Sequence, residues 1–277
     1  MSASLSSGKN HKQENFPVAS WLVRPDARAP ILAYYRFARA SDDIADHPTA
    51  APQEKLRLLA EMRRGLAGEG AAEAMELAQI AGLRGLDLAH AHDLLGAFEQ
   101  DVTVNRTATW EALIAYCAMS AMPVGRFVLD VHGEDRGLWP LSDALCAALQ
   151  VLNHVQDCGK DYRAIDRVYV PQDMLDAAGV PVTALAAARC GAELRAIMGE
   201  LAGRTMVLLD EAAPFARRIA DWRLAAEVAV IHALAVDLTK VLLRRDPLAE
   251  KVHHGKIAAG WLALRAVLGH GWRRLLL

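Results

Sequence analysis

The sequence predicts an all-α protein, and three observations support this. Ala and Leu dominate the 277-residue chain, in which 53% of residues are hydrophobic and only 6% are aromatic. Runs of Val, Ile and Thr are scarce, which favours helix over sheet. Proline and glycine interrupt the apolar periodicity at intervals that suit about ten helices with short joints. We therefore expect one domain over residues 1–277, large enough to bury a core around a central cavity, with residues 1–13 flexible.

Five helices are expected in the first half of the chain. The first long helix begins between Pro25 and Pro30 and ends before Pro48, because proline is tolerated in a first helical turn and stops a helix interior. Asp87 is the expected N-cap of the fourth helix, and Pro123 should bend the fifth. The helices after the first are predicted at residues 52–66, 71–82, 86–102 and 110–131.

The second half begins with a turn-rich connection over residues 132–140. The clearest helix of the chain follows at 141–162, and a loop then runs through Pro171. Later helices are predicted at residues 172–178, 181–202 (with a short break), 203–219, 222–244 and 247–270. Residues 257–277 form a hydrophobic C-terminal helix that charged residues interrupt, so we expect it to pack on the core or lie on a membrane rather than span one.

Charge and cysteine usage limit the possible partners and compartments. The formal net charge of −2 gives no electrostatic case for a nucleic-acid partner. The four cysteines lack CxxC spacing, which favours free thiols in a reducing compartment. Residues 1–15 are polar and lack the apolar region of a signal peptide. We expect a cytoplasmic protein, with peripheral contact at the inner face of the plasma membrane as a further expectation.

Two helices carry polar residues on a face that would normally be apolar. Positions spaced four, three and four apart share one helix face. The first long helix carries such a stripe at Tyr35, Arg39, Asp42 and Asp46. The helix near residue 150 carries the second at Gln150, Asn153 or His154, Asp157 and Asp161. Apolar residues flank both stripes, so each helix is expected to line a wet internal cavity.

Carboxylates in this arrangement suit hard cations. Magnesium takes oxygen ligands and bridges protein carboxylates to phosphate oxygens. Side chains at i and i+4 stack one turn apart, so each aspartate pair can reach one ion cluster, and Asn153 adds a neutral oxygen. Two such helices facing each other would clamp metals and a diphosphate. The alternative interpretation, that acidic pairs at this spacing mark a solvated face, stays open on spacing alone.

The motifs around the two stripes resemble the squalene/phytoene synthase family. They are Arg39-x-x-Asp42-Asp43-x-x-Asp46, Asn153-x-x-Gln156-Asp157-x-x-x-Asp161 and Arg167-Val168-Tyr169-Val170-Pro171. The resemblance covers about residues 14–256. It implies an all-α bundle of the isoprenoid synthase type, in which a cluster of about two or three Mg²⁺ ions lies between two aspartate-rich helices.

Three further stretches resemble one subfamily, which acts in the bacterial hopanoid pathway. Their sequences are NFPVAS at residues 15–20, SAMPVGR at 120–126 and VHHGK at 252–256. That subfamily converts presqualene diphosphate and water into hydroxysqualene and diphosphate. The resemblance therefore implies presqualene diphosphate as the substrate and functional coupling to a presqualene diphosphate synthase.

The resemblance also assigns residue roles. The implied metal ligands are Asp42, Asp46, Asn153, Asp157 and Asp161. The implied substrate-binding residues are Phe16, Arg39, Asn153, Gln156, Arg167, Tyr169 and Lys251. The implied catalytic residues are the four aspartates together with two cavity tyrosines, Tyr35 and Tyr116.

Two departures from the family pattern keep other functions open. Ser20 stands where many condensing relatives have a phenylalanine, and Lys251 stands where some have a diphosphate-binding arginine. The first departure argues against head-to-head condensation of two prenyl diphosphates, which is the reaction of presqualene diphosphate, squalene and phytoene synthases. The second keeps the positive charge but loses the bidentate geometry of arginine. A non-catalytic helical lipid-binding protein or assembly factor is the remaining alternative.

Overall fold

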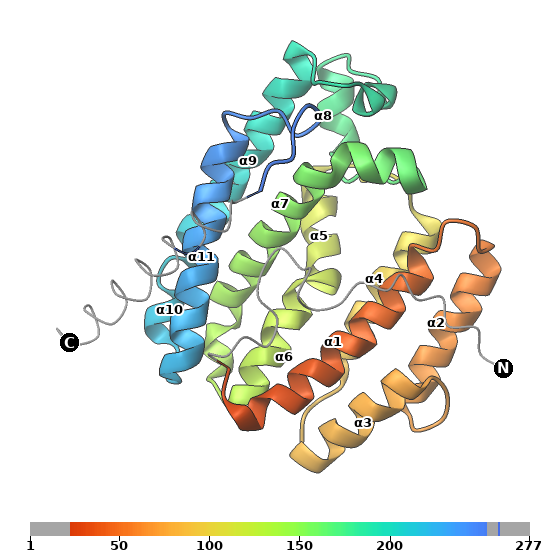
Figure 1. Cartoon of the computed structure of the whole chain (residues 1–277), viewed down its shortest axis with the longest axis vertical. Coiled ribbons are helices and arrows are strands. Elements are labelled where there is room, and N and C mark those ends of the chain that lie inside the picture. Colours follow the sequence, from red (N-terminus) through yellow and green to blue (C-terminus); the bar gives the residue numbers. More distant parts are fainter. Residues whose placement is uncertain (1–22, 254–259, 261–277) are drawn as a thin grey trace. The chain divides into compact units, whose positions relative to one another are not determined.

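A computed structural model describes residues 23–253 and Gly260 of the chain (Figure 1). These residues form helices, turns and one isolated parallel bridge between Arg106 and Val168, with no strand among them. The predicted all-α class is therefore confirmed. The helices pack as two compact units. Among the described residues, unit 1 comprises residues 23–104 and Pro123–Arg136, and unit 2 comprises Asn105–Met122 and residues 137–253. The expectation of a single domain stays a prediction.

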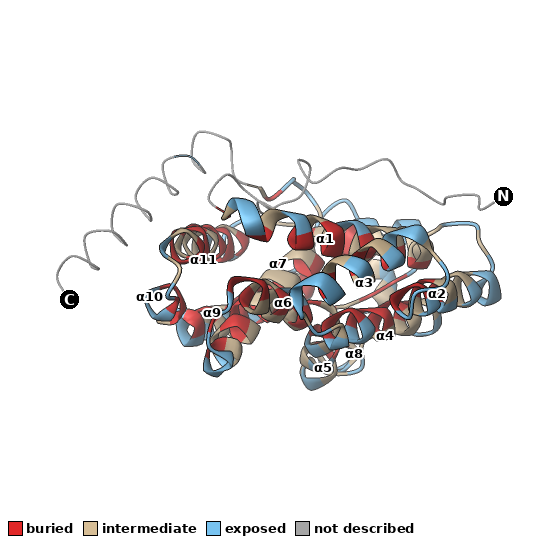
Figure 2. Ribbon diagram, turned by 90° about the horizontal axis from the view of Figure 1, so that it is seen from below, coloured by how far each residue is buried: buried red, intermediate tan, exposed pale blue. Residues whose placement is uncertain are grey.

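Unit 1 packs a first long helix against three others. Helix α1 contacts α2, α3 and α4, and α2 also contacts α3 and α4. The bounds are α1 Pro25–Ala45, α2 Pro52–Leu66, α3 Ala72–Arg84, α4 Ala89–Thr103 and α6 Met122–His132. Figure 2 shows buried and exposed residues on different sides of α1, as expected for an amphipathic helix at the edge of a core.

An aromatic pair lies within the core of unit 1. The rings of Tyr34 and Phe127 stack with their centroids 4.2 Å apart, which joins α1 to α6. The buried Tyr34 hydroxyl donates to the His90 carbonyl oxygen at 3.0 Å, so its polar end is satisfied inside the core. Phe37, one turn away on α1, is fully buried.

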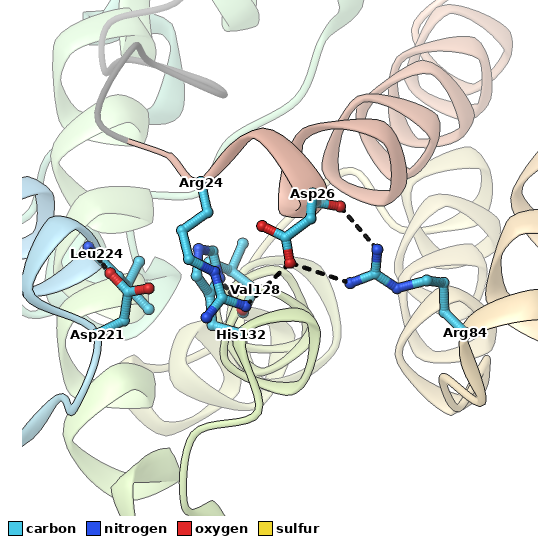
Figure 3. Close-up of polar contacts among 7 residues, drawn as sticks. All are labelled: Arg24, Asp26, Arg84, Val128, His132, Asp221 and Leu224. Atoms are coloured by element: carbon cyan, nitrogen blue, oxygen red, sulfur yellow. Dashed lines mark hydrogen bonds and ion pairs between the residues drawn. The ribbon is translucent and has the colours of Figure 1, made fainter.

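The start of α1 is fixed by its first-turn residues. Pro25 occupies the first turn, where its missing N–H costs no hydrogen bond. Asp26 lies beside it and complements the positive end of the helix dipole. Arg24 and Arg84 approach the Asp26 carboxylate to 3.4 and 3.9 Å, and Arg84 also donates to the Asp26 carbonyl oxygen at 2.8 Å (Figure 3). These contacts tie the entry of α1 to the end of α3.

Unit 2 is organised around α7, a helix of 27 residues. Helix α7 contacts α5, α9, α11 and η3, and α11 also contacts α9 and α10. The bounds are α5 Trp110–Ser120, η2 Arg136–Leu138, α7 Trp139–Ile165, α8 Gln172–Ala177, η3 Val182–Ala186, α9 Ala192–Ala212, α10 Phe215–Arg218 and α11 Trp222–Leu242. The Asp221 carboxylate caps α11 by accepting from the N–H groups of Arg223 and Leu224, the latter drawn in Figure 3.

The predicted helix bounds agree with the structure for some helices and not for others. Residues 52–66 are helical as predicted, but the expected bent helix at 110–131 is two helices that separate at Ala121. The short break predicted within residues 181–202 is present, between η3 and α9, but the predicted boundary between residues 202 and 203 is wrong, because α9 continues through Gly203. Asp87 accepts from the Ala89 N–H, one position before the N-cap Leu88. Residues 246–250 form turns rather than a helix, and residues 257–277 lie outside the described residues apart from Gly260.

Two other sequence expectations concern the membrane and the cysteines. Within the described residues one stretch, Trp110–His132, is long and apolar enough to cross a membrane by length and composition, which core helices also satisfy. The division between α5 and α6 falls inside it. The four cysteines are free thiols, with Cys117 and Cys158 buried and the other two half-buried.

The N-cap of α11 provides a test of this packing. Replacing Asp221 with Ala should lower the free energy of unfolding by about 1 kcal/mol, because two N–H groups at the start of α11 lose their acceptor. Asp221→Asn keeps a side-chain oxygen and should lose less. Urea denaturation of the three proteins measures both differences. An Asn variant as unstable as the Ala variant would show that the cap hydrogen bonds are not what Asp221 contributes.

Candidate active site

The polar stripe of α1 lies on one side of unit 1 at intermediate exposure. Tyr35, Arg39, Asp42 and Asp46 are each partly exposed, whereas their neighbours Tyr34, Phe37 and Ala45 are buried. Asp46 is the C-cap residue of α1, and its N–H donates to the Asp42 carbonyl oxygen. The structure therefore brings the predicted residues of the first stripe together on one helix face.

Arg39 is the cation of this stripe. Its guanidinium donates to an Asp42 carboxylate oxygen at 2.8 Å and to an Asp43 oxygen at 2.5 Å. The Asp43 side chain is 8% exposed, so this residue is a buried partner of Arg39 rather than a surface acid. One guanidinium thus holds two carboxylates with charge-assisted hydrogen bonds, which orients both of them.

Carboxylates outnumber the cation, and the pKa of Asp42 reflects this. Burial, and then the negative charge of Asp46, raise the pKa of Asp42 from 3.8 to about 7. Within this shift, Arg39 acts in the opposite direction, and Asp43 and Asp101 make smaller contributions that raise the pKa. The Asp42 side chain keeps 36% of its area exposed, so solvent screens part of this repulsion. The arrangement has an excess of negative charge that a cation would relieve.

Asp101 is the residue of this cluster that the sequence stripes do not include. It lies on α4 and is 7% exposed, among the apolar residues of the buried helix face. A detectable signal existed, because Leu94, Phe98 and Asp101 follow one another at helical spacing. A carboxylate that continues an apolar seam indicates a charge turned toward other residues of the protein.

The second stripe lies on α7 in unit 2. Asn153, Asp157 and Asp161 are four residues apart and each is partly exposed, so they form one row along the helix. Asp157 is 42% exposed, and one of its oxygens lies 3.3 Å from the ammonium of Lys160. The row is bordered by buried residues such as Leu152. Whether the rows of α1 and α7 face each other, as the sequence suggests, stays a prediction.

Three aromatic side chains gather beside the α7 row. The imidazole of His154 and the ring of Tyr169 stack with centroids 3.5 Å apart and planes 21° from parallel. Tyr116, from α5, lies 5.3 Å from Tyr169 and 5.9 Å from His154 between ring centroids. The hydroxyls of Tyr116 and Tyr169 are 3.3 Å apart. We call Tyr116, His154 and Tyr169 the aromatic cluster.

The loop after α7 is what places Tyr169 in this cluster. Asp166 ends α7 in the left-handed conformation, with φ of 53°, and its carboxylate pairs with Arg106 at 2.6 Å. The next residues pair with the segment before α5, because the Val168 N–H donates to the Asn105 carbonyl at 2.9 Å and the Thr107 N–H to the Val168 carbonyl at 3.1 Å. This non-local pairing fixes the loop that carries the predicted substrate residues.

A buried cation, Arg167, lies beside the aromatic cluster and affects the protonation of His154. Arg167 is 6% exposed, and its guanidinium lies 3.5 Å from the Tyr169 hydroxyl. Burial, and then the positive charge of Arg167, lower the pKa of His154 from 6.5 to about 3. A ring nitrogen of His154 is within hydrogen-bond distance of the Gln150 amide, at 3.1 Å. His154 is therefore a neutral imidazole at physiological pH.

The remaining predicted residues have different positions. Gln156 is buried at 9% exposure, and its amide nitrogen donates to the Val252 carbonyl oxygen. Lys251 is exposed. Phe16 and Ser20 lie outside the described residues. The roles that the resemblance assigns to these residues as substrate contacts stay predictions.

The donor set can be compared with what a divalent metal requires. No group of three or more His, Cys, Asp or Glu residues within the described part of the chain is arranged to hold a metal ion. The chemistry of the donors nevertheless fits Mg²⁺, because the two rows offer carboxylate and amide oxygens without sulfur. The excess of carboxylates around Asp42 is also consistent with a bound cation.

The buried imidazole predicts a pH-dependent contribution to stability. The pKa of His154 is lower in the folded than in the unfolded chain, so the unfolded chain binds the extra proton. The contribution is complete above pH 6.5 and is lost as pH falls toward 3, by up to about 1.4 kcal/mol per pH unit. Unfolding free energies of the wild type and His154→Gln, measured from pH 7 to pH 4, should diverge by this slope. Exposed His92→Gln is the control, and parallel profiles for wild type and His154→Gln would contradict the assignment.

Known proteins resemble the chain over most of its length. Residues 9–257 match the squalene/phytoene synthase family. A hydroxysqualene synthase from Zymomonas mobilis is 49% identical over 271 residues, which cover 96% of this chain and 91% of the relative. One from Rhodopseudomonas palustris is 50% identical and covers 90% and 86%. The crystal structure of the squalene synthase HpnC from Alicyclobacillus acidocaldarius superimposes with a TM-score of 0.72 at 31% identity, covering 82% and 87%. The chain belongs to the squalene/phytoene synthase family.

Proposed function

We propose that this chain converts presqualene diphosphate and water into hydroxysqualene and diphosphate. The observation that carries the proposal is that α7 holds a row of oxygen ligands and a neutral imidazole in an aromatic cluster within one unit. With bound Mg²⁺ the row would take the leaving diphosphate, and the cluster would take a carbocation. Relatives that are about half identical to the chain are hydroxysqualene synthases, which supports the same reaction.

The first chemical requirement is to stabilise the leaving group. Diphosphate departs with the electron pair of the breaking C–O bond and therefore gains negative charge. Bound Mg²⁺ would neutralise that charge, held by Asp42 and Asp46 on one helix and by Asn153, Asp157 and Asp161 on the other. Arg39 orients Asp42 through the 2.8 Å hydrogen bond described above. Arg167 adds a cation next to the aromatic cluster.

The second requirement is to stabilise the cyclopropylcarbinyl cation that ionisation leaves behind. The faces of Tyr116 and Tyr169 suit this, since a cation over an aromatic ring gains roughly 1–2 kcal/mol when water is excluded. A charged imidazole would add a second positive charge beside that of Arg167 and would repel the carbocation more strongly. The low pKa of His154 keeps that ring neutral, so it can stack with Tyr169 without adding positive charge.

The third requirement is capture by water rather than loss of a proton. After rearrangement of the cation, a water oxygen forms the new C–O bond and releases one proton, which gives the alcohol. A base in the cluster would divert the cation to an alkene. His154, with a pKa of about 3, is a weak base and therefore favours water capture.

The partners and location follow from the same chemistry. Substrate and product are lipid-soluble, so the proposal includes peripheral membrane contact and functional coupling to a presqualene diphosphate synthase that supplies the substrate. A cytoplasmic location is proposed with it. Vesicle co-sedimentation measures the membrane contact directly.

The aspartate row predicts a large effect on diphosphate release. Asp157→Asn should reduce release from presqualene diphosphate by about 100-fold or more, because a ligand for the charge-neutralising metal is weakened. Chelation with EDTA should abolish release in the wild type, and added Mg²⁺ should restore it. Exposed Asp210→Asn on α9 is the matched control and should retain full activity. Full activity of a folded Asp157→Asn variant would show that Asp157 is not a ligand of a catalytic metal.

The choice of substrate predicts which prenyl diphosphate reacts. Purified protein with Mg²⁺ should form hydroxysqualene from presqualene diphosphate, detected by mass spectrometry with incorporation of ¹⁸O from labelled water. It should not consume farnesyl diphosphate alone. Accumulation of presqualene diphosphate from farnesyl diphosphate would instead establish the condensing alternative, and no turnover of either substrate would favour a non-catalytic protein.

A further inference from the structure

The chain after α11 turns back along unit 2. Asp246 fixes this turn, because its carboxylate accepts from the Cys190 N–H at 2.8 Å and from the Leu248 N–H at 2.9 Å. The N–H groups of Ala249 and Glu250 donate to the Asp246 carbonyl oxygen. We call residues 246–253 the return segment.

The return segment first meets α7 at a glycine. A Cβ atom placed on Gly159 would lie 2.6 Å from a methyl carbon of Leu248 and 3.0 Å from the Leu185 carbonyl oxygen. Contacts below 3.0 Å require a neighbour to move. Gly159 is therefore a point of close approach, where the missing side chain lets Leu248 lie directly on the helix.

The second meeting point is one helical turn earlier on α7. The Gln156 amide nitrogen donates to the Val252 carbonyl oxygen and lies 3.2 Å from Nδ1 of His253. Val252 is itself 3% exposed, so this end of the return segment is packed as well as hydrogen-bonded. Gln156 and Gly159 are three residues apart and share one helix face. The return segment thus runs antiparallel to α7 across these two residues.

We propose that Gln156 and Gly159 are positioning residues, which dock the return segment against α7 and so set the place of Lys251 and His253 beside the aspartate row. Gln156 immediately precedes Asp157 in the sequence, and Lys251 immediately precedes the carbonyl-bearing Val252. A donor on an undocked segment would lose the orientation that catalysis needs. Docking at two points removes that freedom.

This inference rests on the proposed function only for its catalytic consequence. Docking itself is a property of the folded chain. It can be followed without substrate by hydrogen exchange of a peptide covering residues 243–253. The amides of Leu248, Ala249 and Glu250 are hydrogen-bonded in the docked turn and should exchange slowly.

The first experiment removes the polar contact. In Gln156→Leu, exchange of the 243–253 peptide should become about tenfold faster, since two hydrogen-bonding contacts to the segment are lost. KM for presqualene diphosphate should rise by a similar factor, with Tm within a few degrees of the wild type. Unchanged exchange would overturn the docking role of Gln156.

The second experiment tests the close approach with a designed rescue. Gly159→Ala favours the helix by intrinsic propensity but displaces Leu248, so exchange and KM should both rise. Adding Leu248→Ala should bring the exchange rate and KM part of the way back, because the colliding methyl carbon is gone while the 3.0 Å contact with the Leu185 carbonyl oxygen remains. Gly199→Ala on α9 is the matched control, since its added Cβ meets no atom within 4 Å.

The hydrogen-exchange and kinetic results distinguish the positioning role of Gln156 and Gly159 from the proposed function. Faster exchange and higher KM in both variants, with rescue in the double variant, support the inference. Faster exchange with unchanged kinetics overturns positioning while leaving the proposed function intact. A wild-type protein that does not turn over presqualene diphosphate overturns the proposed function and the catalytic half of this inference together.

Discussion

Mutual repulsion among carboxylates is the constraint on which the functional face of unit 1 depends. Three aspartates lie within two turns of α1, and Asp101 on α4 adds a fourth negative charge to their surroundings. Arg39 compensates only part of this charge, although its guanidinium bonds two of the carboxylates. Such an arrangement lowers the stability of the fold unless protons or cations join it. The Mg²⁺ that we propose for this face would supply the missing positive charge.

The sequence predicts helix faces better than it predicts where helices end. Hydrophobic periodicity placed both polar stripes correctly, because a 3.6-residue repeat is a local property of the chain. The division at Ala121 was missed because only Pro123 was considered as a bend. A boundary was predicted between residues 202 and 203, yet Gly203 lies inside α9, because a glycine in a helix costs only about 1 kcal/mol and tertiary packing readily outweighs that. Asp101 was missed because its partners come from another helix.

Hydrophobic periodicity could not predict the backbone pairing that forms part of the site, because that pairing joins distant segments of the chain. The aromatic cluster exists because the chain after α7 pairs with residues 105–107, more than 60 positions away from Val168. No local pattern encodes that register. The resemblance did point to Tyr116 and Tyr169, but it gave no role to His154, which stacks against Tyr169. The return segment was likewise predicted as a helix, whereas side-chain bonds from Asp246 hold it in turns.

In the proposed function, helix α7 meets two opposite electrostatic demands within a few residues. Asp157 and Asp161 would hold a cation, while His154 would serve the cluster as an uncharged ring. Burial disfavours a positive charge on His154, whereas Asp157 is partly exposed to solvent. Arg167 lowers the pKa of His154 further, since a fixed positive charge disfavours a second one on the imidazole. A leaving group that gains negative charge and a carbon that gains positive charge require just this separation along one helix.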